Sequence, residues 1–283
     1  MYDLFYVLLK VKIMRVKLYF LMTLLPLFFS CNNEEDNFNS FQELDNEQYS
    51  YYVAEALDAM NMPRPEGSYN YPCLPGMPSW KELNSGEEMN RACHVPDDVL
   101  NNQTTQAVIQ AMWEHPKFKD LIGFSSNSSI QESLNNVLLD WNIYLELTKR
   151  PDAASCLVER YNRMQPTKVS HTFYNNSLQL LLSQTIFLEQ LSADEKLLLA
   201  KEMVERKVSV EKVLEMENES SSLDSFYFCL VRIMVSCQYA PMMSWMENNE
   251  AIQQFEESGD IFFLSSEMRK DILDLSIDFI NNN

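Results

Sequence analysis

The chain has 283 residues, of which 46% are hydrophobic and 12% aromatic, so it can bury a sizeable core and is not mainly disordered. Only 5 glycines occur, which argues against β-rich folds and glycine-rich phosphate loops, because such turns need residues that reach positive φ without strain. The formal charge of −19 repels phosphate backbones, which excludes nucleic acid as a favoured partner.

Residues 1–30 have the pattern of a secretory signal. Arg15 and Lys17 follow Met14, and no charged residue occurs from Leu18 to Ser30. A basic segment followed by an apolar segment of about 7–15 residues is typical of a cleaved signal peptide, whereas a membrane-spanning helix needs about 20 apolar residues. We therefore expect residues 1–30 to be removed, and we interpret Met14 as a better start than Met1.

The end of this signal carries a recognisable acceptor site. Leu27-Phe28-Phe29-Ser30-Cys31 resembles the lipobox of bacterial lipoproteins, and its bulky Phe28 and Phe29 are typical of the looser, Bacteroidota-type form. The resemblance implies that Cys31 is acylated and holds the mature chain on a lipid bilayer, since several acyl chains give stable anchoring. The alternative is an ordinary signal peptide that happens to precede a cysteine.

Residues 31–44 follow as the predicted lipidated cysteine and a flexible tether. The run from Asn32 to Ser40 is polar and acidic, so it cannot bury enough apolar surface to fold. In Bacteroidota-type lipoproteins, acids directly after the acylated cysteine resemble a signal for export across the outer membrane. The resemblance implies an outer-membrane location that faces the cell surface rather than the periplasm.

Residues 45–283 are predicted to form a single all-α domain. Apolar residues recur at helical spacing up to Met60, and residues 62–78, rich in proline, then interrupt the pattern as an irregular excursion. Ser129 with Glu132 and Ser192 with Glu195 have capping-box spacing. Further helices are predicted over 79–93, 105–115, 129–149, 151–164, 172–191, 192–207, 209–217, 222–239, 245–257 and 265–281.

The short connections between these helices favour antiparallel helical hairpins. The hairpins could form a closed bundle or a degenerate HEAT, armadillo or TPR-like superhelix, although no fixed repeat period is found. The phrases His94–Leu100 and Arg150–Ala153 are similar to uncharacterised helical lipoproteins of Bacteroidota. That likeness covers roughly a third of the chain and implies no active-site residue.

Motifs that carry chemistry are sparse in this sequence. It contains no Gly-x-Ser-x-Gly elbow, His-Glu-x-x-His motif or Cys-x-x-Cys pair, so no catalytic residue, metal ligand or cofactor is predicted. One polar cluster could in principle bind a cation, although acids at this spacing more often cap short helices. Its members are Glu87, Glu88, His94, Asp97 and Asp98.

Candidate ligand contacts and cross-links come mainly from the excursion. Tyr69, Tyr71 and Trp80 are the candidates for exposed contacts with a glycan or a protein. Cys73 and Cys93 are the candidate disulfide, because a bridge there would pin the excursion to the domain. A set of tryptophans and methionines could line a groove, although such residues at helical spacing usually form core; its members are Trp113, Trp141, Trp245, Met242, Met243 and Met246.

The anchor, the tether and the helical domain together predict a surface-exposed binding or scaffolding module for a protein or glycan partner. Two alternatives remain open from the sequence. One is an enzyme that acts on envelope or extracellular polysaccharide through paired carboxylates. The other is a passive envelope component without a ligand of its own.

Overall fold

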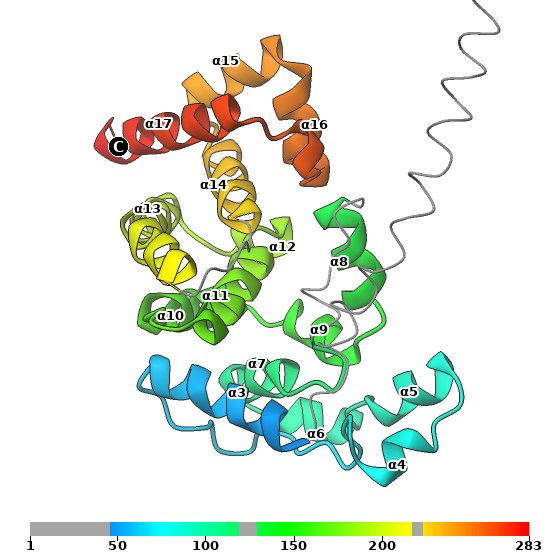
Figure 1. The fold of residues 1–283 in the computed structure, drawn as a ribbon. Coiled ribbons are helices and arrows are strands. Elements are labelled where there is room, and N and C mark those ends of the chain that lie inside the picture. The colour runs from blue at the N-terminus through cyan, green and yellow to red at the C-terminus, as the bar shows by residue number, and fades with distance from the viewer. Residues whose placement is uncertain (1–45, 119–128, 217–222, 283) are drawn as a thin grey trace, which may run out of the picture. The chain divides into compact units, whose positions relative to one another are not determined.

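The computed structural model describes residues 46–118, 129–216 and 223–282, and over these ranges it is all α-helical, with no strand (Figure 1). The all-α prediction is confirmed for these ranges. The predicted signal, Cys31 and the tether lie outside the described residues. The helices are α3 Asn46–Ala59, α4 Pro78–Lys81, α5 Gly86–Ala92, α6 Asp97–Asn102, α7 Thr105–Trp113, α8 Ile130–Leu138, α9 Asn142–Leu147, α10 Ala153–Arg163, α11 Val169–Leu182, α12 Thr185–Leu188, α13 Ala193–Met216, α14 Asp224–Ser236, α15 Ala240–Asn248, α16 Glu250–Ser258, the 3-10 turn η2 Ile261–Phe263 and α17 Ser266–Asn282.

The predicted caps are present at two helix starts. The Ser129 hydroxyl accepts a hydrogen bond from the Glu132 amide at 3.1 Å. Ser192 and Glu195 form a complete capping box, because the Glu195 carboxylate accepts from the Ser192 amide at 2.8 Å while the Ser192 hydroxyl accepts from the Glu195 amide at 3.3 Å. Each cap satisfies amides that the first helical turn leaves without a partner, so these boundaries follow from local sequence.

Several predicted helix boundaries are wrong. The predicted helix 129–149 is divided into α8 and α9, because Trp141 adopts an extended backbone (φ −97°, ψ 110°) between them. The predicted helix 172–191 is divided at Gln184, and 245–257 is divided at Asn249, whose side chain accepts from two amides of α16. Conversely, α13 continues through Lys207, where two helices were predicted, since no glycine or proline interrupts it.

The core is centred on α14. This helix contacts α11, α12, α13, α15, α16 and α17, and Figure 1 shows it running from α11 toward the group α15–α17. Its side chains from Asp224 to Val231 are all buried, as expected for a helix whose residues are mainly apolar. Within the described ranges no single helix is long and apolar enough to cross a membrane, and α14 with α15 would pass that test only as a pair bent by 109°.

The helices share no regular repeat length over the described part of the chain. They range from 4 residues in α4 to 24 in α13. Elements far apart in the sequence also pack together, as α3 does with α11 and α8 with α16. A regular solenoid repeat would instead confine contacts to neighbouring repeats.

Arginines join neighbouring elements by binding the last carbonyls of helices. The Arg150 guanidinium donates to the carbonyls of Leu100 (2.8 Å) and Gln103 (2.6 Å) at the end of α6. Arg206 of α13 donates to the Tyr161 carbonyl near the end of α10, and its guanidinium lies over the Tyr161 ring. A cation at a helix C-terminus is favoured by the helix dipole, so these contacts fix how the helices meet.

One arginine is fully buried between α7 and α10. Arg160 has no exposed surface and donates to Gln106 Oε1 (2.8 Å), Gln106 O (2.9 Å) and Gln110 Oε1 (3.0 Å). Its guanidinium carbon lies 4.7 Å from the centroid of the Trp113 ring. Burial lowers the pKa of Arg160 to about 10, which still leaves the group charged at neutral pH. The charge is thus accommodated by amide oxygens and an aromatic face.

Candidate functional site

The excursion 62–78 is joined to the C-terminal end of α7 by a bidentate ion pair. Arg64 donates through Nε to Glu114 Oε1 at 2.8 Å and through Nη2 to Glu114 Oε2 at 2.6 Å. The same guanidinium donates to the carbonyls of Ser68 and Tyr69. Because one side chain binds both the excursion and the residue that ends α7, the proline-rich segment lies against the domain.

The three aromatic residues predicted as exposed ligand contacts have different environments. Tyr71 is only 6% exposed, so its assignment as an exposed contact is wrong. It packs edge-on against Tyr69, at 5.0 Å between ring centroids, and against His115, at 5.5 Å. Tyr69 and Trp80 are half-buried, and Trp80 lies on α4, which has no buried residue. Tyr71 is buried because the excursion folds back against the domain and packs this ring against Tyr69 and His115.

His115 is the centre of this aromatic group. It is buried and stacks on Trp141 with ring centroids 3.9 Å apart. The Lys117 amide donates to His115 Nδ1 at 3.2 Å, so the neutral ring carries its proton on Nε2. Burial, assisted by the nearby Lys117 charge, lowers the pKa of His115 to about 3. The ring is therefore a neutral packing element at physiological pH.

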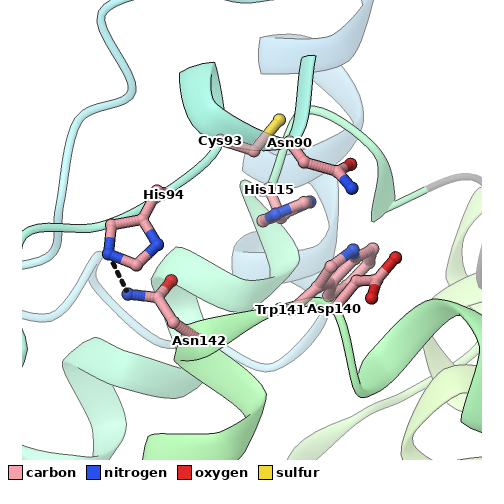
Figure 2. Close-up of a pocket in the computed structure, with 7 residues that line it drawn as sticks. All are labelled: Asn90, Cys93, His94, His115, Asp140, Trp141 and Asn142. Atoms are coloured by element: carbon pink, nitrogen blue, oxygen red, sulfur yellow. Dashed lines mark hydrogen bonds between the residues drawn. The ribbon is translucent and has the colours of Figure 1, made fainter. Parts of the chain in front are cut away.

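A small hollow opens beside this stack, and Figure 2 shows the side chains around it. His94 and Asn142 are hydrogen-bonded at 3.2 Å across one side, while Asn142 also accepts from the Val95 amide and donates to its carbonyl. The free space is about 10 Å³, which is on the order of one water molecule. The hollow is therefore too small for an organic ligand. It is lined by Asn90, Cys93, His94, His115, Asp140, Trp141 and Asn142.

The residues of the predicted polar cluster and of the candidate disulfide all lie in this region. Glu87 and Glu88 lie in the first turn of α5, and Asp97 and Asp98 in the first turn of α6, which confirms their interpretation as helix-start residues. In the described ranges no group of three His, Cys, Asp or Glu side chains is placed to hold a metal ion. No disulfide joins Cys73 to Cys93, which is buried in the wall of the hollow, so the candidate disulfide is not formed.

The buried His115 predicts a loss of stability in weak acid. Its folded-state pKa of about 3 lies below the ordinary value of 6.5, so the unfolded chain binds the extra proton between these values. The free energy of unfolding should therefore fall as pH drops through this window, by at most about 1.4 kcal/mol per pH unit. Urea unfolding between about pH 7 and about pH 5 measures the slope.

A matched pair of variants isolates this effect from other groups. His115→Phe should flatten the slope, whereas His94→Gln should keep it, because the His94 side chain is 55% exposed. His171, whose pKa burial also lowers, contributes equally to both variants. Identical slopes in His115→Phe and in the unaltered chain would contradict the assignment.

A larger groove lies between α15 and α17. Its volume is about 380 Å³, and it is largely open to solvent, so it is shallower than the clefts that enclose most of a small ligand. Trp245 contributes from α15, where its indole is half-buried against the core. The other lining residues come from α17: Asp271, Asp274, Leu275 and Asp278.

The three carboxylates of the groove share one face of α17. Asp271, Asp274 and Asp278 are three and four residues apart, which places them in line along one side of a helix. Asp274 pairs with the exposed Lys270 at 2.5 Å. Asp278 accepts from the Tyr239 hydroxyl and, at 2.7 Å, from the Asn282 side chain. Asp271 makes no hydrogen bond or ion pair in the described part of the chain.

The sequence indicated only one of the five residues that line this groove. Trp245 was considered as a groove residue, while Trp113 and Met242 proved to be fully buried core. The acidic stripe of α17 was missed. Its signal is the spacing of Asp271, Asp274 and Asp278, but an acidic helix face is usually only solvated surface, and nothing local places it beside Trp245.

No family model matches the chain, and comparison with curated proteins and with solved structures found no match either. The candidate site is therefore defined by its own geometry: a groove with an indole on one side and three carboxylates in line on the other.

Proposed function

We propose that the chain is a lipid-anchored outer-membrane protein whose helical domain binds a partner molecule in the groove between α15 and α17. The signal and the lipobox at Cys31 support the anchor. The groove, with its half-buried Trp245, is the observation that supports binding, because an indole beside polar groups supplies both contact area and orientation. The acids after Cys31 favour the cell surface as the place of binding.

The arrangement of carboxylates favours binding over polysaccharide hydrolysis. A glycosidase pair flanks the scissile bond from two sides, with the carboxyl groups about 5–9.5 Å apart. In the groove, Asp271, Asp274 and Asp278 all come from one face of α17. In the small hollow, Asp140 is the sole carboxylate among the lining residues. Neither set places two acids on opposite walls.

The test is cross-linking by the full-length chain in its native host. A photoreactive benzoylphenylalanine at Leu275 should give a discrete cross-linked product, because Leu275 lines the groove. The same residue at Leu198 is the control, since Leu198 is 64% exposed on α13. Equal products from both positions, or none from Leu275, would contradict partner binding in the groove.

Labelling and fractionation of the same host cells test the lipid anchor. Radiolabelled palmitate should enter the chain, and Cys31→Ser should abolish labelling and move the protein from the membrane fraction to the soluble fraction. Cys73→Ser is the matched control and should change neither result. Protease treatment of intact cells should degrade the anchored chain if it faces the surface. Unchanged membrane association of Cys31→Ser would refute the lipid anchor.

A further inference from the structure

We propose that the occupant of the α15–α17 groove is a segment of a partner protein that carries lysine or arginine side chains. This inference rests on the proposed function, because it names the class of partner for the same groove. Three observations support it. They are the pairing of the groove carboxylates, the half-buried indole of Trp245, and the net charge of the chain.

The carboxylates are available to a ligand to different degrees. Asp271 is half-buried and unpaired within the described residues. Asp274 is held by Lys270, whose side chain is 73% exposed, and exposed ion pairs of this kind contribute little stability. A cation from a ligand can therefore bind Asp271 and replace Lys270 on Asp274, while Asp278 stays fixed by its bond from Tyr239.

The indole of Trp245 adds a second recognition element of different chemistry. Elsewhere in the chain, guanidinium groups cover aromatic rings, as Arg160 covers Trp113 at 4.7 Å and Arg232 covers Phe228 at 5.0 Å. In the described part of the chain no cation covers Trp245. Tryptophan is the aromatic ring that binds cations most strongly. A cationic side chain in the groove would thus contact an indole and a carboxylate together.

Charge favours a basic peptide over a neutral glycan. A net charge of −19 attracts cationic partners over a distance and gives a neutral sugar no such advantage. The stripe from Asp271 to Asp278 extends about 10 Å along α17. Lysines at alternate positions of an extended peptide are about 7 Å apart, so two of them fit this length.

The experiment is titration calorimetry of the full-length chain, in detergent at low ionic strength, with a capped pentapeptide that has lysines at positions two and four. Asp271→Asn and Trp245→Leu should each weaken binding about tenfold, and Trp245→Phe should recover part of the loss. Lys270→Gln should tighten binding severalfold, because it removes the cation that competes for Asp274. A misfolded variant would not bind more tightly.

The controls separate recognition from simple attraction to an acidic protein. Asp58→Asn, at an exposed position on α3, should bind as the unaltered chain does. Equal weakening by Asp58→Asn and Asp271→Asn, or equal binding of a peptide with glutamines in place of the lysines, would overturn the proposal. Binding of neutral maltohexaose that depends on Trp245 would assign the groove to a glycan instead. Failure of the peptide with retained cross-linking at Leu275 would refute only the partner class and leave the proposed function standing.

Discussion

Gly259→Ala is expected to lower the free energy of unfolding by about 2–5 kcal/mol, while Gly67→Ala should cost only about 1–2 kcal/mol. Both glycines have positive φ, at +67° and +78°, so alanine is strained at either position. They differ in their surroundings. A Cβ at Gly259 would lie 2.7 Å from Ile130 Cβ and 3.2 Å from Phe228, whereas a Cβ at Gly67 would meet nothing within 4 Å.

The neighbours of Gly259 cannot move away without a loss of core packing. Ile130 and Phe228 are buried, and Phe228 packs edge-on against Phe255 at 5.9 Å. The adjacent carbonyl of Ser258 accepts from the Ser129 hydroxyl at 2.6 Å, which ties the end of α16 to the start of α8. Urea unfolding of the two variants measures the difference. Equal losses of stability would show that backbone conformation alone matters and that the close contact relaxes.

The sequence predicted those parts of the fold that depend on local patterns. The caps at Ser129 and Ser192 follow from side chains three residues apart, and the apolar run from Phe226 predicts the buried helix α14. The division between α8 and α9 could not be predicted in this way. Trp141 leaves helical geometry where its ring stacks on His115, which is a contact between segments distant in the sequence.

The candidate site shows the same division between local and tertiary information. Sequence spacing places Asp271, Asp274 and Asp278 on one helix face, and it places Trp245 on another helix. That the two helices border one groove depends on how both pack around α14. The prediction that Tyr71 is exposed was wrong for a related reason. The excursion could be recognised from the sequence, but the direction in which it folds back could not.

Arg160→Met is expected to lower the free energy of unfolding by about 3–5 kcal/mol. Methionine fills much of the space but donates no hydrogen bond. Gln110 would then keep a buried oxygen that has lost its donor, which costs about 1–3 kcal/mol, and the half-buried Gln106 would lose its bonds to the guanidinium as well. The contact of the guanidinium with Trp113 would be lost as well.

Arg163→Met is the matched control on the same helix. Arg163 pairs with Glu159 at 2.9 Å, but both side chains are nearly half exposed, so its removal should cost about 1 kcal/mol or less. Comparable losses for the two variants, measured by urea unfolding, would contradict the role assigned to Arg160.

A second substitution tests where the cost of Arg160→Met arises. If it comes from unpaired oxygens rather than from lost packing, removing one of them should cost less once Arg160 is gone. Gln110 is fully buried, accepts from Arg160 at 3.0 Å and donates to Glu114 Oε1 at 2.8 Å, so Gln110→Met should cost less in the Arg160→Met background than in the unaltered chain, by about 1 kcal/mol or more. Equal costs of Gln110→Met in the two backgrounds would instead assign the cost of Arg160→Met to packing between α7 and α10.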